Sequence, residues 1–202
     1  MLDYLDPLFL IKALGLIGVL LIIFAESGLF FGFFLPGDSL LFTAGLLASQ
    51  GYLNIYYLLP GVFLMAVLGD TFGYTFGRKI GPKIFTREDS LFFHKKHVER
   101  AKNFYEKYGN KTIVLARFIP IVRTFAPIVA GVGQMDYRKF LTYNIFGGLA
   151  WTVLLAGGGY FLGEIVPGIE KYVTLILVLI ILTSFLPAIS EIWQVWRQKH
   201  SA

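Results

Sequence analysis

Long apolar runs dominate the pattern of hydrophobic and polar positions along this chain of 202 residues. About 20 apolar residues in a helix are enough to cross the hydrocarbon core of a bilayer. Four segments come close to that length or exceed it: Leu8–Ala25, Tyr52–Gly77, Phe140–Gly163 and Tyr172–Ser190. The pattern therefore predicts an all-α integral membrane protein with about four membrane-crossing helices.

Two further apolar segments, 26–49 and 112–135, contain residues that interrupt a helix. The first is broken by Pro-Gly-Asp at 36–38, and the second contains Pro120 and Pro127. Proline lacks the N–H that a helix interior needs, so each segment favours short helices over one spanning helix. A half-helix of about ten residues is roughly 15 Å long, which reaches the bilayer midplane and lets the chain turn back. We therefore predict two re-entrant helical hairpins, the first with half-helices that begin at residue 26 and meet at 36–38.

An internal repeat relates the two broken segments. The matching pieces lie 84 to 86 residues apart: 34–36 with 118–120, 44–45 with 130–131, and 73–77 with 159–163. Each repeat unit, about 26–77 and about 112–163, combines one hairpin with one crossing helix. One net membrane crossing separates the units, so they face opposite ways across the bilayer. Inverted repeats with broken helices at the midplane are typical of secondary transporters, and this repeat predicts two facing hairpins.

The composition fits one membrane domain over residues 1–202. Apolar residues make up 56% of the chain and charged residues 15%, against about 25% charged residues in average proteins. A soluble domain of this length could not bury so much apolar surface in one core, and the same numbers exclude a disordered chain. The lack of cysteine excludes a disulfide scaffold, a thiolate nucleophile and a cysteine-based metal site.

Positive charge is concentrated in the loop at 78–111. Ten basic and four acidic residues give this loop a local charge of +6, while the rest of the chain sums to −1. Short basic loops stay in the cytoplasm. Tracing the helices outward from this loop places the N-terminus there too, and the basic residues after the 172–190 segment place the C-terminus there. Affinity for anionic lipid head groups explains the basic run better than nucleic-acid binding, so we expect no nucleic-acid partner.

Five charged residues lie within or beside the apolar segments: Glu26, Asp38, Asp70, Arg117 and Arg123. A charge at bilayer depth is costly, so it usually pairs with a partner and serves a function. Glu26, Asp38, Arg117 and Arg123 together sum to zero, which a pocket with little water tolerates. The alternative for Glu26 and Arg117 is a place at the membrane interface, where long side chains extend to water.

These charges favour coupled binding of an anion and protons. The planar fork of the arginine guanidinium suits phosphate, and a carboxylate taken out of water accepts a proton more readily, whereas a nearby arginine opposes this. An anionic head group that binds Arg117 and Arg123 would displace Glu26 and Asp38, which then become easier to protonate. The pattern therefore predicts phosphate binding by the two arginines and proton coupling by the two carboxylates.

The sequence around these charges resembles the DedA family of membrane proteins, which carry the SNARE-associated or VTT domain. The resemblance covers roughly residues 20–165. The residues that carry it are Glu26, Phe34–Asp38, Ala44-Gly45, Gly69-Asp70, Tyr74, Gly77-Arg78, Gly81, Tyr108-Gly109, Arg117–Pro120, Arg123-Thr124, Ala130-Gly131 and Met135.

The resemblance implies two facing re-entrant hairpins and a place in the bacterial inner membrane. It also implies movement of a lipid with a phosphate head group, undecaprenyl phosphate or a phospholipid, linked to the proton motive force. The acidic and basic functional positions of the family fall on Glu26, Asp38, Arg117 and Arg123. We expect the site to be supported by four neighbouring residues: Asp70, Pro36, Gly37 and Pro120.

Other functions stay open from the sequence. A passive lipid scramblase or a membrane-homeostasis factor without proton coupling would have the same fold. A small-anion transporter would also use the arginines, although an ion needs a closed pore and a long-tailed lipid needs a groove open sideways to the bilayer. An intramembrane aspartyl protease built on Asp38 and Asp70 would leave the buried arginines without a role, so we do not expect an enzyme.

We expect neither a cofactor nor a metal. His94 and His97 lie three positions apart in the basic loop without an acidic residue at a suitable spacing, which favours solvated surface residues. Trp151 is expected to be a packing or interface residue. The sequence leaves open whether the protein forms a homo-oligomer.

Overall fold

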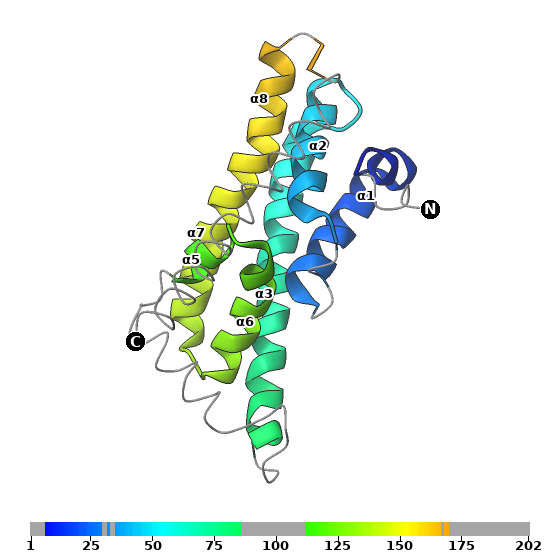
Figure 1. Cartoon of the computed structure of the whole chain (residues 1–202). Coiled ribbons are helices and arrows are strands. Elements are labelled where there is room, and N and C mark those ends of the chain that lie inside the picture. The colour runs from blue at the N-terminus through cyan, green and yellow to red at the C-terminus, as the bar shows by residue number, and fades with distance from the viewer. Residues whose placement is uncertain (1–6, 30–31, 33–34, 86–111, 167, 170–202) are drawn as a thin grey trace, which may run out of the picture.

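The computed structural model of the protein describes residues 7–29, 32, 35–85, 112–166 and 168–169, and every regular element in these ranges is helical (Figure 1). The elements are α1 (Pro7–Gly28), α2 (Gly37–Ser49), α3 (Ile55–Phe85), α5 (Thr112–Ala116), α6 (Pro120–Val132), α7 (Tyr137–Thr152), the π-helical turn η3 (Val153–Gly157) and α8 (Gly158–Ile165). The elements α7, η3 and α8 follow one another without a break and form one long helix. The all-α prediction is confirmed for this part of the chain.

Three stretches of these helices are long and apolar enough to cross a membrane: Phe9–Gly28, Ile55–Ile80 and Tyr137–Ile165. They correspond to three of the four predicted crossing segments, which confirms the prediction of an integral membrane protein. The fourth predicted segment, 172–190, lies outside the described residues, as does 86–111, the larger part of the basic loop.

Two predicted helix boundaries are wrong. Helix α1 does not end at Ala25 but continues to Gly28, so Glu26 lies in its last turn instead of starting a separate half-helix. Helix α3 does not end at Gly77 but continues to Phe85, which shortens the predicted loop. In both places a polar side chain looks like a break in the sequence, whereas the helix is held by main-chain hydrogen bonds that polar side chains do not interrupt.

Helix α1 is kinked at Gly15. This residue has φ 61° and ψ −157°, a conformation that glycine adopts readily because it has no Cβ to clash with the main chain. The first turns of α1 therefore run in a different direction from the rest of the helix, as Figure 1 shows near the N-terminus.

The helices α2 and α6 are too short to cross a bilayer alone. Each has 13 residues, about 20 Å at 1.5 Å per residue, whereas the hydrocarbon core is about 30 Å thick. Pro36 precedes α2 and Pro120 is the first residue of α6, where a fixed φ and a missing N–H fit the start of a helix. Figure 1 shows the two helices leaving the middle of the molecule toward opposite ends. Their re-entrant course through a bilayer stays a prediction.

Each of these half-helices packs on the long helix of the other repeat unit. Helix α2 packs on η3 and α8, and α6 packs on α3. A Cβ on Gly45 of α2 would collide with the main chain of Ala156, and a Cβ on Gly131 of α6 would collide with the main chain of Tyr74. Gly45 and Gly131 are a matching pair of the sequence repeat. The repeat therefore extends from the sequence to the packing of the helices.

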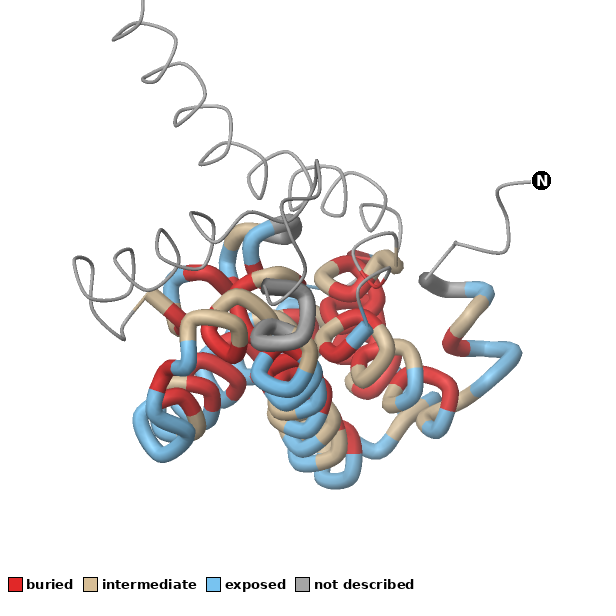
Figure 2. The backbone as a smooth tube through the Cα atoms, turned by 90° about the horizontal axis from the view of Figure 1, so that it is seen from below, coloured by how far each residue is buried: buried red, intermediate tan, exposed pale blue. Residues whose placement is uncertain are grey.

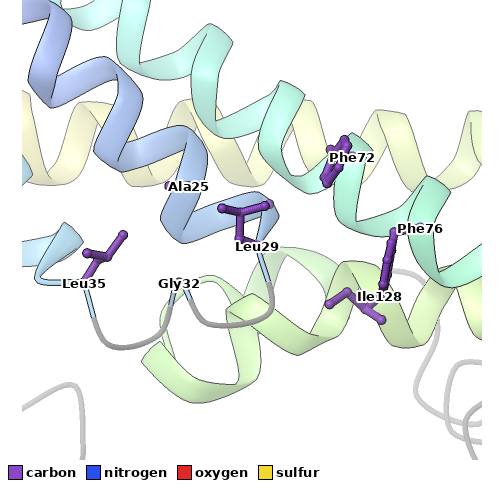
Figure 3. A pocket seen from close by; sticks show the side chains of 8 residues that line it. Ala25, Leu29, Gly32, Leu35, Phe72, Phe76 and Ile128 are labelled. Atoms are coloured by element: carbon purple, nitrogen blue, oxygen red, sulfur yellow. The ribbon is translucent and has the colours of Figure 1, made fainter.

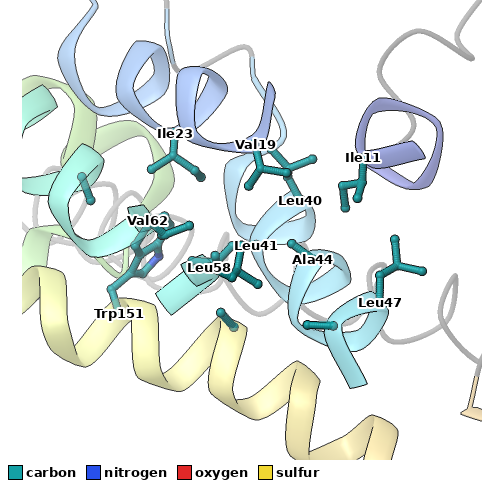
Figure 4. Packing of buried hydrophobic residues seen from close by; sticks show 13 residues of the cluster. Ile11, Val19, Ile23, Leu40, Leu41, Ala44, Leu47, Leu58, Val62 and Trp151 are labelled. Atoms are coloured by element: carbon teal, nitrogen blue, oxygen red, sulfur yellow. The ribbon is translucent and has the colours of Figure 1, made fainter. Parts of the chain in front are cut away.

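Most of the buried hydrophobic side chains in the described part of the chain gather in one cluster between α1, α2, α3, α7 and η3. Figure 4 shows Trp151 pointing from α7 toward Leu58 and Val62 of α3, within this cluster. A second, smaller cluster includes Tyr74 and Phe140, whose rings stack with their centroids 4.5 Å apart. The outward faces of the helices carry the exposed residues (Figure 2), many of them large and apolar, as the contact with lipid requires.

Candidate functional site

Arg123 lies at the centre of a buried cluster of charges. It comes from α6 and forms ion pairs with Glu26 of α1 and Asp38 of α2. The side chains are 9%, 2% and 16% exposed for Arg123, Glu26 and Asp38. The cluster therefore joins three helices, and it joins the half-helix of one repeat unit to that of the other.

Trp151 of α7 completes this cluster. Its indole Nε1–H donates a hydrogen bond of 2.9 Å to Asp38 Oδ1, and the guanidinium carbon of Arg123 lies 5.1 Å from the centroid of its ring. The distance is within the range of a cation–π interaction. One aromatic side chain thus contacts both partners of an ion pair, which corrects the expectation of a packing or interface role alone.

The start of α2 is shaped to accept Glu26. A Cβ on Gly37 would collide with the Glu26 carboxylate, so glycine at this position lets the carboxylate approach the helix. The N-terminal end of a helix carries a partial positive charge that stabilises anions, and Asp38 lies in this first turn as well. Among the described residues, Glu26 Oε2 has no hydrogen-bond partner. This cluster therefore holds a buried acceptor that is still free.

Arg117 lies at the centre of a second buried cluster, between α5 and α6. Its Nη2 is 2.5 Å from Asp70 Oδ2 of α3 and also donates to Asn144 Oδ1 of α7 and, at 3.4 Å, to the carbonyl of Ala66. Asn144 Nδ2 in turn donates to the carbonyl of Val67 at 3.1 Å. The side chains of Arg117 and Asp70 are 6% and 5% exposed. This cluster fixes the chain before α6 to both long helices.

Gly147 on α7 leaves room for Arg117. A Cβ at this position would come 3.1 Å from Arg117 Cδ, closer than an ordinary van der Waals contact. The Nε of Arg117 is buried and has no hydrogen-bond partner among the described residues. One donor of this guanidinium is therefore available to a further acceptor.

The structure divides the predicted site into two clusters. The sequence predicts that Arg117 and Arg123 both face Glu26 and Asp38, but only Arg123 does so. The carboxylate partner of Arg117 is Asp70, which was expected only to support the site. The side chains of Glu26 and Arg117 do not extend to water, as the alternative of an interface position requires, since only 2% and 5% of these residues are exposed.

The other expectations for single residues concern helix starts and carboxylate pairs. Pro36 and Pro120 lie at the starts of α2 and α6, and Gly37 gives Glu26 its room. Asp38 and Asp70 each pair with a different arginine, which does not favour the carboxylate dyad of an aspartyl protease. Within the described part of the chain, there is no group of three His, Cys, Asp or Glu side chains that could hold a metal ion.

Sequence reasoning missed two residues of the site. Asn144 is fully buried, and its position inside an apolar segment was a signal that could have been used, because buried amides need partners. Trp151 gave a weaker signal, since tryptophan occurs both in cores and at membrane interfaces.

Comparison with known proteins gives the family. The model of the VTT domain matches residues 35–161. The chain belongs to the VTT-domain family. This match runs from just before α2 into α8 and includes Asp38, Asp70, Arg117 and Arg123, whereas Glu26 lies before it. The family assignment therefore covers both half-helices and both long helices that follow them.

Several relatives are membrane proteins of bacteria. Protein DedA of Escherichia coli K12 is 48% identical over 174 residues, which cover 85% of this chain and 79% of the relative. The uncharacterized membrane protein Rv0364 of Mycobacterium tuberculosis is 46% identical, with 99% and 91% coverage. Inner membrane protein YqjA of Escherichia coli K12 is 32% identical, with 75% and 68% coverage. No solved structure matches this VTT-domain chain.

Proposed function

We propose that this VTT-domain protein carries a lipid with an anionic phosphate head group across the bacterial inner membrane and that the site binds protons together with the head group. The observation that carries the proposal is the Arg123 cluster. A buried arginine is held there by two carboxylates from different helices, and intramembrane charges of this kind usually mark a transport path. The assignment to a family of membrane proteins supports the same function.

The charges of the Arg123 cluster support the coupling to protons. Glu26, Asp38 and Arg123 together carry −1 when all three are ionised. One proton makes the cluster neutral, and a second leaves the positive charge of Arg123 without a partner. A head group with one negative charge can then replace the carboxylates, because a buried cation needs a counter-charge. Binding of the anion therefore goes together with binding of protons.

Arg117 supports phosphate as the recognised group. A guanidinium binds phosphate through several donors held in one plane, and the Nε of Arg117 has no partner among the described residues. Asp70 neutralises this arginine. We propose that Arg117 is the second phosphate-binding residue, and that undecaprenyl phosphate or a phospholipid supplies the head group.

The proposed topology follows from the basic loop. With 86–111 and its flanks in the cytoplasm, we propose that the N- and C-termini lie there too. The proposal requires no covalent chemistry, no metal and no cofactor. It leaves open whether the transporter works as a monomer or a homo-oligomer.

A flipping assay in vesicles tests the proposal. Purified protein is reconstituted in phosphatidylcholine vesicles that contain a small fraction of undecaprenyl phosphate or phosphatidylglycerol, and an outside-only reagent reports the head groups that have crossed. We expect transport by the wild type, loss of most transport in Arg117→Lys, which keeps the charge but not the fork, and loss in Arg123→Ala. The exposed Lys139→Ala variant serves as control.

Each other outcome contradicts a stated part of the proposal. Full transport by Arg117→Lys would exclude a requirement for the guanidinium of this residue in phosphate recognition. Transport that ignores an imposed pH gradient would indicate a passive scramblase. Transport of inorganic phosphate without any lipid would indicate a small-anion transporter.

A further inference from the structure

An apolar pocket lies beside the Arg123 cluster, between α1, α3 and α6. It has a volume of about 470 Å³, within the range of pockets that hold small-molecule ligands. Figure 3 shows side chains from these three helices arranged around it. Its lining residues are Ala25, Gly28, Leu29, Gly32, Leu35, Phe72, Phe76 and Ile128.

The mouth of this pocket faces the surroundings of the helices. Leu29, Phe72 and Phe76 are 44%, 48% and 45% exposed. The two phenylalanines lie on α3 within the membrane-crossing stretch Ile55–Ile80. A side chain exposed at that position faces hydrocarbon, so the pocket opens sideways to the lipid.

The pocket is lined by residues of the two segments that carry the carboxylates of the Arg123 cluster. Ala25 directly precedes Glu26 in α1, and Leu35 lies three positions before Asp38 at the start of α2. The pocket therefore adjoins the segments that position Glu26 and Asp38 against Arg123. The lining residues within the described part of the chain carry neither a charge nor a polar side chain, so the ligand part that fits is a hydrocarbon.

Close helix contacts hold this space open at a defined place. A Cβ on Gly28 would meet the main chain of Gly69, and a Cβ on Gly77 would collide with the main chain of Ile128. Helix α3 thus touches α1 through one glycine pair and α6 through another glycine. The pocket lies between these two contacts, and rigid contacts on both sides give it a fixed wall.

We propose that this pocket binds a hydrocarbon chain of the transported lipid while its phosphate head group reaches Arg123. The inference rests on the proposed function and specifies its substrate: the site takes a lipid rather than a free anion. Moving a lipid hydrocarbon chain from the bilayer into an apolar pocket gains little free energy, because both environments are hydrocarbon. The head group therefore supplies the affinity, and the pocket keeps the chain in hydrocarbon while the head group is inside the protein.

Photo-crosslinking with chain-labelled lipids tests this assignment. Phosphatidylglycerol with a diazirine in one acyl chain is added to phosphatidylcholine vesicles that contain the full protein, and the labelled residues are identified by mass spectrometry. We expect adducts at Ile128 above those at Ile17, which is 72% exposed on the lipid-facing side of α1. In Ala25→Trp, whose indole fills the pocket, the adducts at Ile128 fall to the level at Ile17.

Two further variants keep the test decisive. Ile17→Trp adds the same indole on the outside of the same helix and should leave the adducts at Ile128 unchanged. If Ala25→Trp fails to fold, Leu29→Trp fills the pocket from its mouth. Equal labelling of Ile128 and Ile17 in the wild type, or labelling of Ile128 that persists in the filled variants, would overturn the inference.

The same vesicles separate this inference from the proposed function. Labelling in the pocket without any flipping by the wild type would contradict the transport proposal and leave the chain site standing. Flipping that survives in Ala25→Trp while labelling is lost would remove the pocket from the transport path.

Discussion

Arg117 and Arg123 are both buried, but their partners differ. Arg123 has two carboxylates and the face of Trp151, whereas Arg117 has one carboxylate, the amide of Asn144 and a main-chain carbonyl. Removing a single carboxylate therefore leaves Arg123 with a counter-charge and Arg117 without one among the described residues. The two clusters should respond differently to the same kind of substitution.

Asp70→Asn should destabilise the protein more than Asp38→Asn. Leaving a buried charge without its partner costs about 3–5 kcal/mol, and this applies in full to Arg117, while Glu26 still neutralises Arg123 in Asp38→Asn. Denaturant unfolding of the purified variants in detergent measures the loss of stability in both. The exposed Glu164→Gln should change stability by no more than about 0.5 kcal/mol, and an Asp70→Asn variant as stable as this control would contradict the role given to Asp70.

Trp151 offers a second test at the scale of one side chain. Trp151→Phe keeps an aromatic face for Arg123 but loses the hydrogen bond that the indole N–H donates to Asp38. A hydrogen bond to a charged group contributes about 1.5–3 kcal/mol to stability. Trp151→Leu also loses the cation–π contact, worth about 0.5–2 kcal/mol. We expect stability and flipping rate to be highest in the wild type, lower in Trp151→Phe and lowest in Trp151→Leu.

The exposed Phe146→Leu on the same helix is the control for this series, and it should behave as the wild type. Equal loss in Trp151→Phe and Trp151→Leu would mean that the hydrogen bond alone matters. A Trp151→Phe variant with wild-type stability would contradict the contribution of the indole N–H.

At the scale of elements, glycine contacts between the repeat units hold the half-helices in place. We expect Gly45→Ala and Gly131→Ala each to destabilise the protein by about 1–3 kcal/mol, the range for overpacking a tight contact, because each Cβ would meet main-chain atoms of the opposite long helix. Gly158→Ala is the matched control, since a Cβ at Gly158 meets nothing within 4 Å and alanine favours a helix by up to about 1 kcal/mol.

Unfolding of the three alanine variants in detergent checks this expectation. A loss in only one of Gly45→Ala and Gly131→Ala would show that the two contacts are not equivalent in energy, despite their equivalent places in the repeat. A loss in Gly158→Ala as large as in the other two would contradict the account altogether.

The sequence predicts the elements better than the contacts between them. The crossing helices follow from the length of apolar runs, because that length must match the thickness of the bilayer. Helix ends are less well predicted, as α1 and α3 show by continuing through polar residues. The kink at Gly15 could not be predicted from the sequence, since glycine is common throughout this chain.

Four charged residues of the predicted site, Glu26, Asp70, Arg117 and Arg123, are buried, but the pairing of the site's charges could not be predicted. Which carboxylate meets which arginine depends on how α2 and α6 pack on the opposite long helices, and that packing is set by shape at glycines such as Gly45 and Gly131. A net charge of zero over Glu26, Asp38, Arg117 and Arg123 was consistent with one cluster. The net charge did not show that Arg117 pairs with Asp70 instead of with Glu26 or Asp38.

At the scale of the whole molecule, the two repeat units meet at an ion pair. Asp38 and Arg123 are 85 positions apart in the chain, between the offsets of 84 and 86 that relate the matching pieces of the repeat. Both lie in the first turn or so of their half-helices, α2 and α6, and their side chains meet where the two repeat units are in contact (Figure 1). In the proposed transporter, a site at this place would face either side of the membrane through equivalent movements of the two units.

The prediction that the two repeat units face opposite sides of the membrane can be tested with single cysteines, because the chain has none of its own. The turn between α2 and α3 and the turn between α6 and α7 lie at opposite ends of the molecule (Figure 1). We expect Tyr52→Cys to react with a membrane-impermeant maleimide from outside the cell, and Arg138→Cys to react only after the cytoplasmic side is opened. Labelling of both positions from the same side would contradict the inverted arrangement.

The most direct test of the account is the dependence of flipping on an imposed pH gradient, compared between the wild type and Glu26→Gln in the same vesicles. Glutamine keeps the size of the side chain at the start of α2 but neither carries a charge nor exchanges a proton. We expect a pH gradient to change the flipping rate of the wild type, and Glu26→Gln to move the phosphate lipid still, with a weaker response to the gradient because only Asp38 is left to bind a proton. An unchanged response in Glu26→Gln would contradict the binding of protons together with the head group at the Arg123 cluster.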